Sequence, residues 1–220
     1  MTLFSRPLAA ALAALPLLAA AAPGAVVTTP QVRAELVAQA PEGVRPGQPL
    51  QLSLVLQHKP EWHTYWKNPG DSGLPTQLQW TLPAGFNAGD IDWPTPKKLP
   101  IGPLLNYGYD GTVLLPVTVQ VPAGFTGAEL PVALHAEWLV CRDVCIPEQG
   151  DFAITVPAQA ATAGSAALFA AAREAQPQGV PGAAASAAVK GDVLEVRVEG
   201  LDRKSTRLNS SHSSVSRMPS

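Results

Sequence analysis

The first part of the chain repeats short segments in which apolar and polar positions alternate. Leu52, Leu54 and Leu56 face one way in the segment 50–58, and mostly polar residues face the other. A period of two over this length predicts a half-buried strand. Further strands are predicted over 31–40, 77–82, 112–121, 132–140 and 151–156. Because Gly and Pro separate these short strands, we predict an all-β fold, a β-sandwich, over residues 26–157.

The chain changes character after the predicted sandwich. Residues 158–184 are rich in Ala, Gly and Pro, which is typical of a linker. Within it, Ser165 can cap a short helix over 166–175. A hairpin closed by a Lys-Gly-Asp turn follows, and we predict that residues 185–201 are the first strands of a second β unit. Two strands alone are marginally stable, so we expect the rest of this unit to be missing.

The amino-terminal segment has the pattern of a secretory signal. Arg6 precedes an apolar run, mostly Leu and Ala, over 8–22, and small residues follow it. This is the order of a charged region, an apolar region and a cleavage site. The run is broken by Pro16 and is short for a membrane span. We therefore predict a signal peptide over 1–25 and export, with a bacterial periplasm as the expected location.

Residues 202–220 differ in composition from the rest of the chain. They are rich in Ser and Arg, have no apolar period, and begin with a segment that looks like a translated sequencing adapter. We expect an artefactual or disordered tail here. The natural protein is then expected to continue beyond Leu201.

The charge balance argues against one class of partner. Residues 26–201 carry ten Lys or Arg and sixteen Asp or Glu, a formal net charge of −6. Proteins that bind nucleic acid present a basic stripe, so no nucleic-acid partner is expected. The sequence also has no serine-nucleophile motif, no matched carboxylate pair and no Gly-rich phosphate loop. Hydrolase chemistry therefore has no support.

The chain has two cysteines, Cys141 and Cys145, with three residues between them. In an extended strand, positions four apart lie roughly 13 Å from one another, whereas a disulfide needs Cα atoms within about 7 Å. A bond between them therefore requires a chain reversal, with residues 142–144 at the tip of a hairpin. Such a tight disulfide is either a structural staple or a redox pair that exchanges with other proteins. The spacing alone leaves both readings open.

The residues around the pair do not identify a reactive sulfur. Arg142 favours a thiolate, whereas Asp143 and Glu148 disfavour one. His135 shares a strand face with Cys141 but lies about 20 Å away along an extended strand, so no histidine is an obvious base. By alternation, Cys141 faces away from the core-facing positions of its strand. This predicts that its sulfur lies at the outer surface or rim of the sheet.

Aromatic and turn-forming residues concentrate in two segments, 61–76 and 104–111, which we expect to form loops. Loop aromatics can simply plug the end of a sandwich. The alternative is that they frame a recognition surface or cover the sulfur pair.

Three stretches together resemble a known family. They are HTYWKNPGDSGLPT (63–76), NYGY (106–109) and WLVCRDVCIPE (138–148). In this order they resemble the N-terminal periplasmic domain of the thiol:disulfide interchange protein DsbD family, particularly its ScsB-like branch. The resemblance covers 31–157 and implies an immunoglobulin-like sandwich. The membrane and thioredoxin-like domains of the family are absent, which implies a truncated chain.

The resemblance also implies a function in thiol–disulfide exchange. The Cys141/Cys145 pair would accept electrons from a membrane-embedded reductase domain, itself fed by thioredoxin, and pass them to disulfides of exported proteins. Its partners would be periplasmic thioredoxin-like or disulfide isomerase proteins, and the membrane and thioredoxin-like domains of its own full-length chain in the inner membrane. The fragment would be a protein-disulfide reductase component that does not act alone. By the family pattern, Cys145 would form the mixed disulfide and Cys141 would resolve it.

In the family pattern, a cap loop shields the sulfurs until a partner docks. The segment around Asn106, Tyr107 and Tyr109 would match this cap, with Tyr65 and Trp66 in its surroundings. The chain departs from the pattern in two ways. Better-known members have five residues between their cysteines, where this chain has three. They also carry an aromatic residue where this chain has Asn106, a place that Tyr107 or Tyr109 could take.

Two other functions are compatible with the cysteine pair. Two thiolates can hold Cu(I), which would make the chain a copper-tolerance-associated Cu(I)-binding module. Residues 26–201 contain no methionine, however, and their histidines are scattered at His58, His63 and His135. The other alternative is a structural β-sandwich stapled by the disulfide. We expect no metal site and no cofactor.

Overall fold

The computed structural model describes residues 23–162, 166–191 and 193–200. The strands in these ranges are β1 (Val26–Thr28), β2 (Val32–Gln39), β3 (Pro49–His58), β4 (His63–Gly70), β5 (Gln77–Thr81), β6 (Asn87–Ile91), β7 (Lys97–Ile101), β8 (Leu104–Asp110), β9 (Thr112–Gln120), β10 (Glu129–Cys141), β11 (Cys145–Pro157), β12 (Ala184–Lys190) and β13 (Val193–Glu199). The helix is α1 (Ala166–Ala175). Most of the predicted signal peptide and all of the predicted tail lie outside the described residues.

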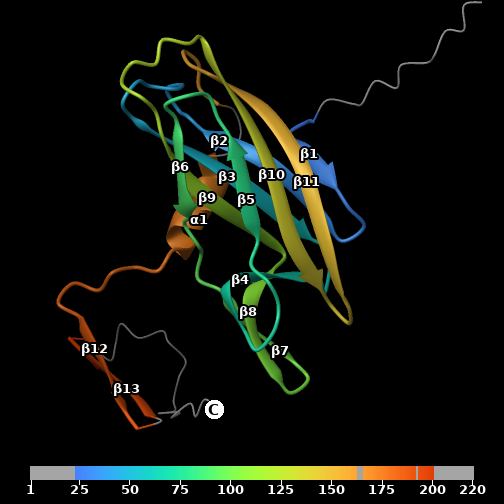
Figure 1. The fold of residues 1–220 in the computed structure, drawn as a ribbon, viewed down its shortest axis with the longest axis vertical. Coiled ribbons are helices and arrows are strands. Elements are labelled where there is room, and N and C mark those ends of the chain that lie inside the picture. Colours follow the sequence, from blue (N-terminus) through green and yellow to red (C-terminus); the bar gives the residue numbers. More distant parts are fainter. Residues whose placement is uncertain (1–22, 163–165, 192, 201–220) are drawn as a thin grey trace, which may run out of the picture.

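Two antiparallel sheets pack face to face and form a sandwich (Figure 1). One sheet has the strand order β1-β2-β3-β9-β6, and the other has the order β11-β10-β4-β8-β7, with β5 also paired to β10. Successive side chains of a strand point to opposite faces. The inward-facing positions, such as Leu54, Leu115, Val132 and Trp138, therefore form one core between the sheets. The predicted all-β sandwich is confirmed.

The helix α1 packs on the outer face of the first sheet. Phe169 and Ala172 of the helix form a second apolar cluster with Val37, Val55 and Leu114. The last three residues lie on β2, β3 and β9, on the face turned away from the main core. Aliphatic side chains on both faces of a strand require cover on both sides, and the helix supplies the outer one. The predicted helix is confirmed with the predicted bounds.

Strands β12 and β13 form a separate two-stranded antiparallel sheet, with Lys190 opposite Val193 at its turn. The predicted hairpin is therefore confirmed. Every side chain of β12 is exposed, and a two-stranded ribbon without a buried face is only marginally stable. That this hairpin begins a second domain stays a prediction.

Parts of the two segments that we expected to be loops, 61–76 and 104–111, form strands instead: residues 63–70 are β4 and residues 104–110 are β8, whereas residues 71–76 form a loop as expected. Residues of β4 pair with β8 through Thr64 opposite Tyr109 and Tyr65 opposite Gly108. We expected loops over these residues because Asn, Asp, Gly and Pro have low strand propensity. Strand propensity depends strongly on the neighbouring strands, however, and here the pairing outweighs it. The turn-forming residues are accommodated by a register shift between Tyr65 and Gly70. Both strands thereby become part of the sheet that contains the cysteines.

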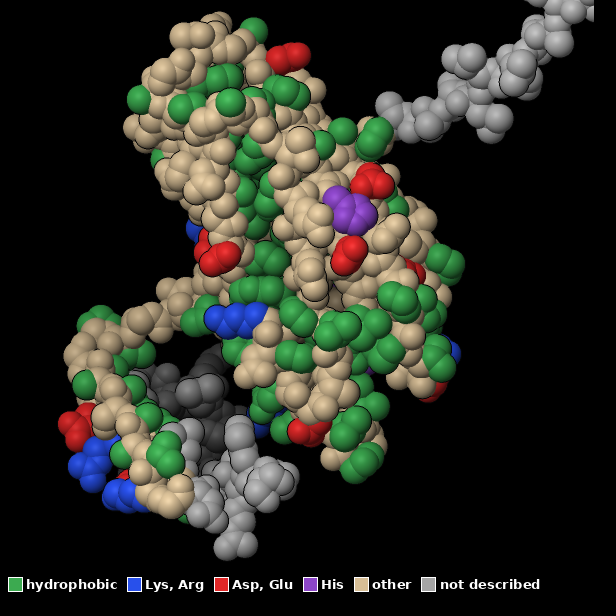
Figure 2. All heavy atoms as spheres, viewed as in Figure 1, with side chains coloured by type: hydrophobic (Ala, Val, Ile, Leu, Met, Phe, Trp, Pro, Cys, Tyr) green, Lys and Arg blue, Asp and Glu red, His purple; other side chains and the backbone are tan. Residues whose placement is uncertain are grey.

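The surface of the sandwich shows no concentration of charge on the face in Figure 2, where acidic and basic side chains are scattered among hydrophobic ones. In the part of the chain that the structure describes, no helix is both long and apolar enough to cross a membrane.

Candidate functional site

The candidate site lies at the turn of the β10–β11 hairpin. The two strands pair in continuous register from Glu129 opposite Pro157 to Cys141 opposite Cys145. At the tip, the Arg142 N–H donates to the Val144 carbonyl oxygen at 3.1 Å. The two cysteines form a disulfide with their Cα atoms 4.1 Å apart. The predicted chain reversal is therefore confirmed.

The two cysteines of this disulfide have different surroundings. Cys141 is 1% exposed, whereas Cys145 is exposed. We predicted the outer surface or the rim of the sheet for Cys141. It is buried and so does not lie at the outer surface, but as the last residue of β10 it does lie at the rim. At this end of the strand, Cys141 lies between Cys145 of β11 and His63 of β4. Of the two bonded cysteines, Cys141 is thus enclosed, whereas Cys145 is accessible to solvent.

Tyr65 of β4 lies directly beside the exposed cysteine. Its hydroxyl is 3.8 Å from Cys145 Sγ and 3.4 Å from His63 Nε2. The His63 and Tyr65 rings meet edge to face, with centroids 5.2 Å apart. Burial raises the pKa of Tyr65, so its hydroxyl keeps its proton at neutral pH. Burial also lowers the pKa of His63, against a smaller opposing effect of Asp110.

The charged residues around the turn pair with other groups. Arg142 Nε donates to Asp143 at 2.8 Å, and its Nη1 lies 3.6 Å from Glu61. Glu148 accepts the Trp138 indole N–H at 2.9 Å. Arg142, which the sequence suggested as a thiolate-stabilising cation, is therefore engaged by two exposed carboxylates.

Asn106 holds the loop that follows β4 in place. Its side chain is fully buried and binds this loop. The Ser72 N–H donates to Asn106 Oδ1 at 3.0 Å, and Asn106 Nδ2 donates to Ser72 Oγ at 2.9 Å. Nearby, the Leu105 N–H donates to Asp71 Oδ2 at 2.8 Å. These bonds attach the loop 71–76 to β8.

The remaining aromatic residues of the predicted site contact groups other than the cysteines. Trp66 and Tyr107 contact one another edge to face, with centroids 6.5 Å apart. The Tyr109 hydroxyl donates to the Pro94 carbonyl at 2.7 Å. Among the five aromatic and amide residues proposed from the sequence, Tyr65 is the one with a recorded contact to a cysteine in the described part of the chain.

The sequence did not identify His63 or Gly73 as site residues. The alternation of strand residues could have identified His63. Residues two apart on a strand share a face, and Tyr65 was already a candidate. Gly73 has a φ of +102°, and a Cβ there would overlap the Tyr65 ring. The loop 71–76 therefore rests on Tyr65 with no room for a side chain.

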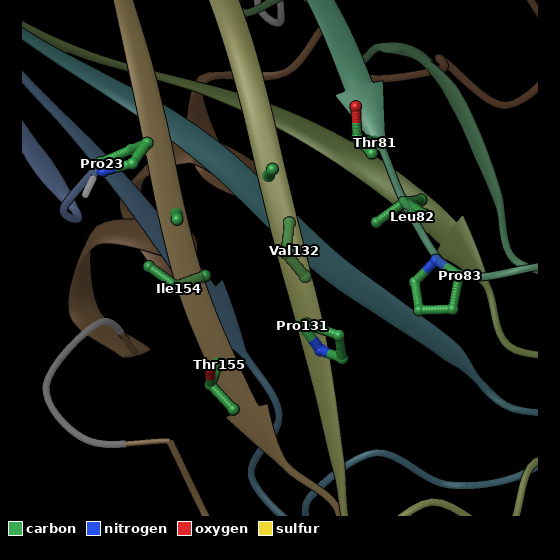
Figure 3. Close-up of a pocket in the computed structure, with 10 residues that line it drawn as sticks. Pro23, Thr81, Leu82, Pro83, Pro131, Val132, Ile154 and Thr155 are labelled. Carbon is green, nitrogen blue, oxygen red and sulfur yellow. The ribbon is translucent and has the colours of Figure 1, made fainter. Parts of the chain in front are cut away.

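Two grooves flank the hairpin. One, about 610 Å³, is lined by apolar and small polar residues such as Leu82, Pro131 and Ile154 (Figure 3). It lies toward the end of the hairpin opposite the cysteines and contains no titratable side chain, so it offers no redox chemistry. The other, about 370 Å³, lies along the half of the hairpin nearer the cysteines, and its lining includes Leu74 and Trp138.

Comparison with known proteins identifies the family. A family model described as thiol:disulfide interchange protein DsbD, N-terminal, matches residues 31–157. The chain belongs to this family. Membership of the DsbD N-terminal family and the closed Cys141–Cys145 disulfide together support a role in thiol–disulfide exchange.

One of the solved structures that match the chain shares its fold. The N-terminal periplasmic domain of ScsB from Proteus mirabilis is 21% identical, with a TM-score of 0.57 over 78% of this chain and 66% of that chain. At this identity the match shows a shared fold. A yeast GGA1 GAE domain is 11% identical, with a TM-score of 0.32 over 59% of this chain and 96% of that chain. No curated protein matches the chain.

Proposed function

We propose that this chain is a periplasmic thiol–disulfide exchange domain that relays electrons through Cys141 and Cys145. It accepts them from a membrane-embedded reductase domain of its full-length chain and passes them to disulfides of exported thioredoxin-like or disulfide isomerase proteins. The observation that carries the proposal is the asymmetry of the disulfide, which joins an exposed cysteine, Cys145, to a buried one, Cys141. An exchange reaction needs one sulfur that an incoming thiolate can reach in line.

The asymmetry supports a different step for each cysteine. A partner thiolate attacks Cys145 Sγ, a partner–Cys145 disulfide forms, and the electron pair of the broken bond goes to Cys141 Sγ. A second thiolate of the partner then attacks the partner's own sulfur. This attack releases Cys145 as a thiolate and leaves the domain reduced and the partner oxidised. In the reverse direction, the Cys145 thiolate attacks a substrate disulfide, and Cys141 then attacks Cys145 Sγ and releases the reduced substrate.

The surface around Cys145 suits a docking partner. Leu74 and Val144, one in the loop 71–76 and one in the cysteine turn, are each 62% exposed. The groove of about 370 Å³ along the half of the hairpin nearer the cysteines adds apolar area. Exposed apolar groups next to a reactive sulfur can contact a partner when it docks.

The reduction potential tests the proposed function. We expect equilibration with thiol–disulfide buffers to give a potential above about −300 mV, because structural disulfides lie below this value. Oxidised glutathione should form a stable mixed disulfide with the Cys141→Ser variant at Cys145. The matched Cys145→Ser variant, which keeps only the buried cysteine, should react far more slowly. A potential below about −300 mV together with equal reaction of the two variants would establish a structural staple instead.

A further inference from the structure

The hydroxyl of Tyr65 lies between two polar groups at the site. It is 3.8 Å from Cys145 Sγ and 3.4 Å from His63 Nε2. A disulfide sulfur has no hydrogen, so Tyr65 is the donor in the first contact. A phenol has one hydrogen, so in the second contact the Tyr65 oxygen accepts a hydrogen from His63 Nε2. The geometry therefore defines a directed chain from His63 through Tyr65 to Cys145.

We propose that Tyr65 is a catalytic residue that donates a hydrogen bond to the Cys145 thiolate, and that His63 is a positioning residue that orients the Tyr65 hydroxyl. The proposal rests on the exchange function above. It adds to that function the group that stabilises the reacting sulfur. It also assigns to a tyrosine the role that the sequence suggested for Arg142.

The hydrogen bond strengthens when the disulfide opens. In the release step, the bond between the partner sulfur and Cys145 breaks, and its electron pair goes to Cys145 Sγ. A thiolate is a charged acceptor, and charge-assisted hydrogen bonds are shorter and roughly twice as strong as neutral ones. Contacts at reacting groups are often long in the resting state and shorten when charge develops. Tyr65 keeps its proton throughout, so no other reactant is required.

The surroundings of Tyr65 hold its ring in place. The side chain is 1% exposed, and its strand pairs with Gly108 of β8. On the opposite side, Tyr65 bridges to Pro75, and Gly73 lies against the ring. A hydroxyl fixed in this way loses little conformational freedom when it binds a thiolate, which is the condition for preorganised stabilisation.

The charged and titratable groups around His63 are few. Asp110 of β8 lies opposite His63 in the sheet and is paired with Lys97 of β7. His58 of β3 is also close enough to interact electrostatically with His63. Burial lowers the pKa of His63, and Asp110 raises it by a smaller amount. Among the described residues, none of these other groups forms a hydrogen bond with Cys145, so Tyr65 is its donor.

The alkylation rate of the reduced chain measures thiolate stabilisation directly. Iodoacetamide reacts with thiolates, and trypsin cleavage after Arg142 separates the two cysteines for mass spectrometry. We expect iodoacetamide to alkylate Cys145 of the Tyr65→Phe variant about tenfold more slowly than Cys145 of the wild type at pH 7. At high pH, where every thiol is ionised, the two alkylation rates should be equal. The matched control Thr76→Val, which removes a buried hydroxyl from the loop 71–76, should follow the wild-type profile.

Variants at position 63 separate positioning from packing. His63→Gln keeps an Nε2–H donor and should retain most of the wild-type profile, whereas His63→Leu should shift the profile as Tyr65→Phe does. If Tyr65→Phe fails to fold, replacement of Tyr65 by 3-fluorotyrosine, a stronger donor, should move the profile to lower pH. An alkylation profile that is unchanged in Tyr65→Phe, or in the fluorotyrosine protein, overturns the proposal.

The outcomes distinguish this inference from the function on which it rests. A wild-type potential above about −300 mV with an unchanged Tyr65→Phe profile leaves the exchange function standing and removes Tyr65 from it. A potential below that value, together with equal reaction of Cys141→Ser and Cys145→Ser with oxidised glutathione, removes the exchange function whatever the alkylation profile shows.

Discussion

At the residue scale, His58 is held in one protonation state by its neighbours. Its Nδ1 lies 2.8 Å from the Gly111 carbonyl oxygen, and its Nε2 lies 3.0 Å from Thr64 Oγ1. A carbonyl only accepts, so the hydrogen of the neutral ring is on Nδ1, and Nε2 accepts from the Thr64 hydroxyl. Burial lowers the pKa of His58 to about 4 from its ordinary value of 6.5. The neutral ring is thus part of the packing beneath β4.

This residue predicts a loss of stability in mild acid. Between pH 6.5 and about 4, the unfolded chain binds a proton at His58 that the folded chain does not. The free energy of unfolding therefore falls as the pH falls through this window, by about 2 kcal/mol between pH 7 and pH 4.5. Urea unfolding at the two pH values measures the loss.

The variant His58→Asn tests the assignment, because it keeps a donor toward Gly111 without a titrating group. The loss between pH 7 and pH 4.5 should shrink by about the same amount in this variant. His135→Asn is the control. Asp151, followed by Glu137, raises the pKa of His135 by hydrogen bonding, so its contribution has the opposite sign. If the free energy of unfolding of His58→Asn falls between pH 7 and pH 4.5 as much as that of the wild type, His58 is not the source of the loss.

At the element scale, the loop 71–76 joins β4 to the rest of its sheet. Asn106 and Asp71 attach the loop to β8 by hydrogen bonds, and Gly73 rests on the Tyr65 ring. The loop therefore controls the position of Tyr65, which in turn contacts Cys145. The family resemblance suggested a cap centred on Asn106. In this geometry, Asn106 anchors the segment that covers Tyr65, and whether that segment shields the sulfurs stays a prediction.

A side chain at Gly73 should destabilise the protein by more than the cost of a positive φ, because it also overlaps the Tyr65 ring. Gly73→Ala adds a strained positive φ and an overlap with Tyr65, and we expect a loss of about 3 kcal/mol in the free energy of unfolding. Gly102→Ala is the matched control. Its φ is +57° with nothing within 4 Å of the added Cβ, so it should cost about 1 kcal/mol. Equal losses in urea unfolding of the two variants would show that the loop moves freely off Tyr65.

At the scale of the whole molecule, the segment after the sandwich is attached to it. Phe169 is 2% exposed in its cluster with Val37, Val55 and Leu114. The Thr95 N–H also donates to the Ala175 carbonyl at 2.9 Å. Isolated helices of this length are unstable in water, so α1 depends on this contact. The stretch that composition marked as a linker contains an element that packs on the sheet opposite the one with the cysteines.

Removal of the Phe169 ring should release the helix without unfolding the sandwich. Phe169→Ala deletes a buried ring and should raise amide hydrogen exchange across α1 about a hundredfold. The neighbouring Leu168 is 40% exposed, and Leu168→Ala should leave the exchange close to that of the wild type. Exchange in β2 and β3 should stay slow in both variants. Equal exchange of the helix in the two variants would contradict the packing role of Phe169.

Much of the fold follows from the sequence because its signals are local. The alternation of Leu52, Leu54 and Leu56 fixes a strand and its buried face wherever the neighbours lie, since the period is a property of the extended backbone. The reversal between Cys141 and Cys145 follows from the length of a disulfide compared with the length of a strand. The helix α1 was also predicted from local signals, namely a capping Ser165 before an Ala-rich segment.

The tertiary structure decided which strand ends meet. Tyr65 and Cys145 are separated by 80 residues, and their contact depends on how β4 aligns with the end of β10. No local pattern encodes this alignment, because register is set by strands that are distant in the sequence. The same nonlocal pairing buries Cys141, turns the expected loops into strands and places α1 over Val55. The sequence thus determined the strands with a clear alternation and the sulfur pair, whereas the pairing of strands determined which cysteine is exposed and which hydroxyl it faces.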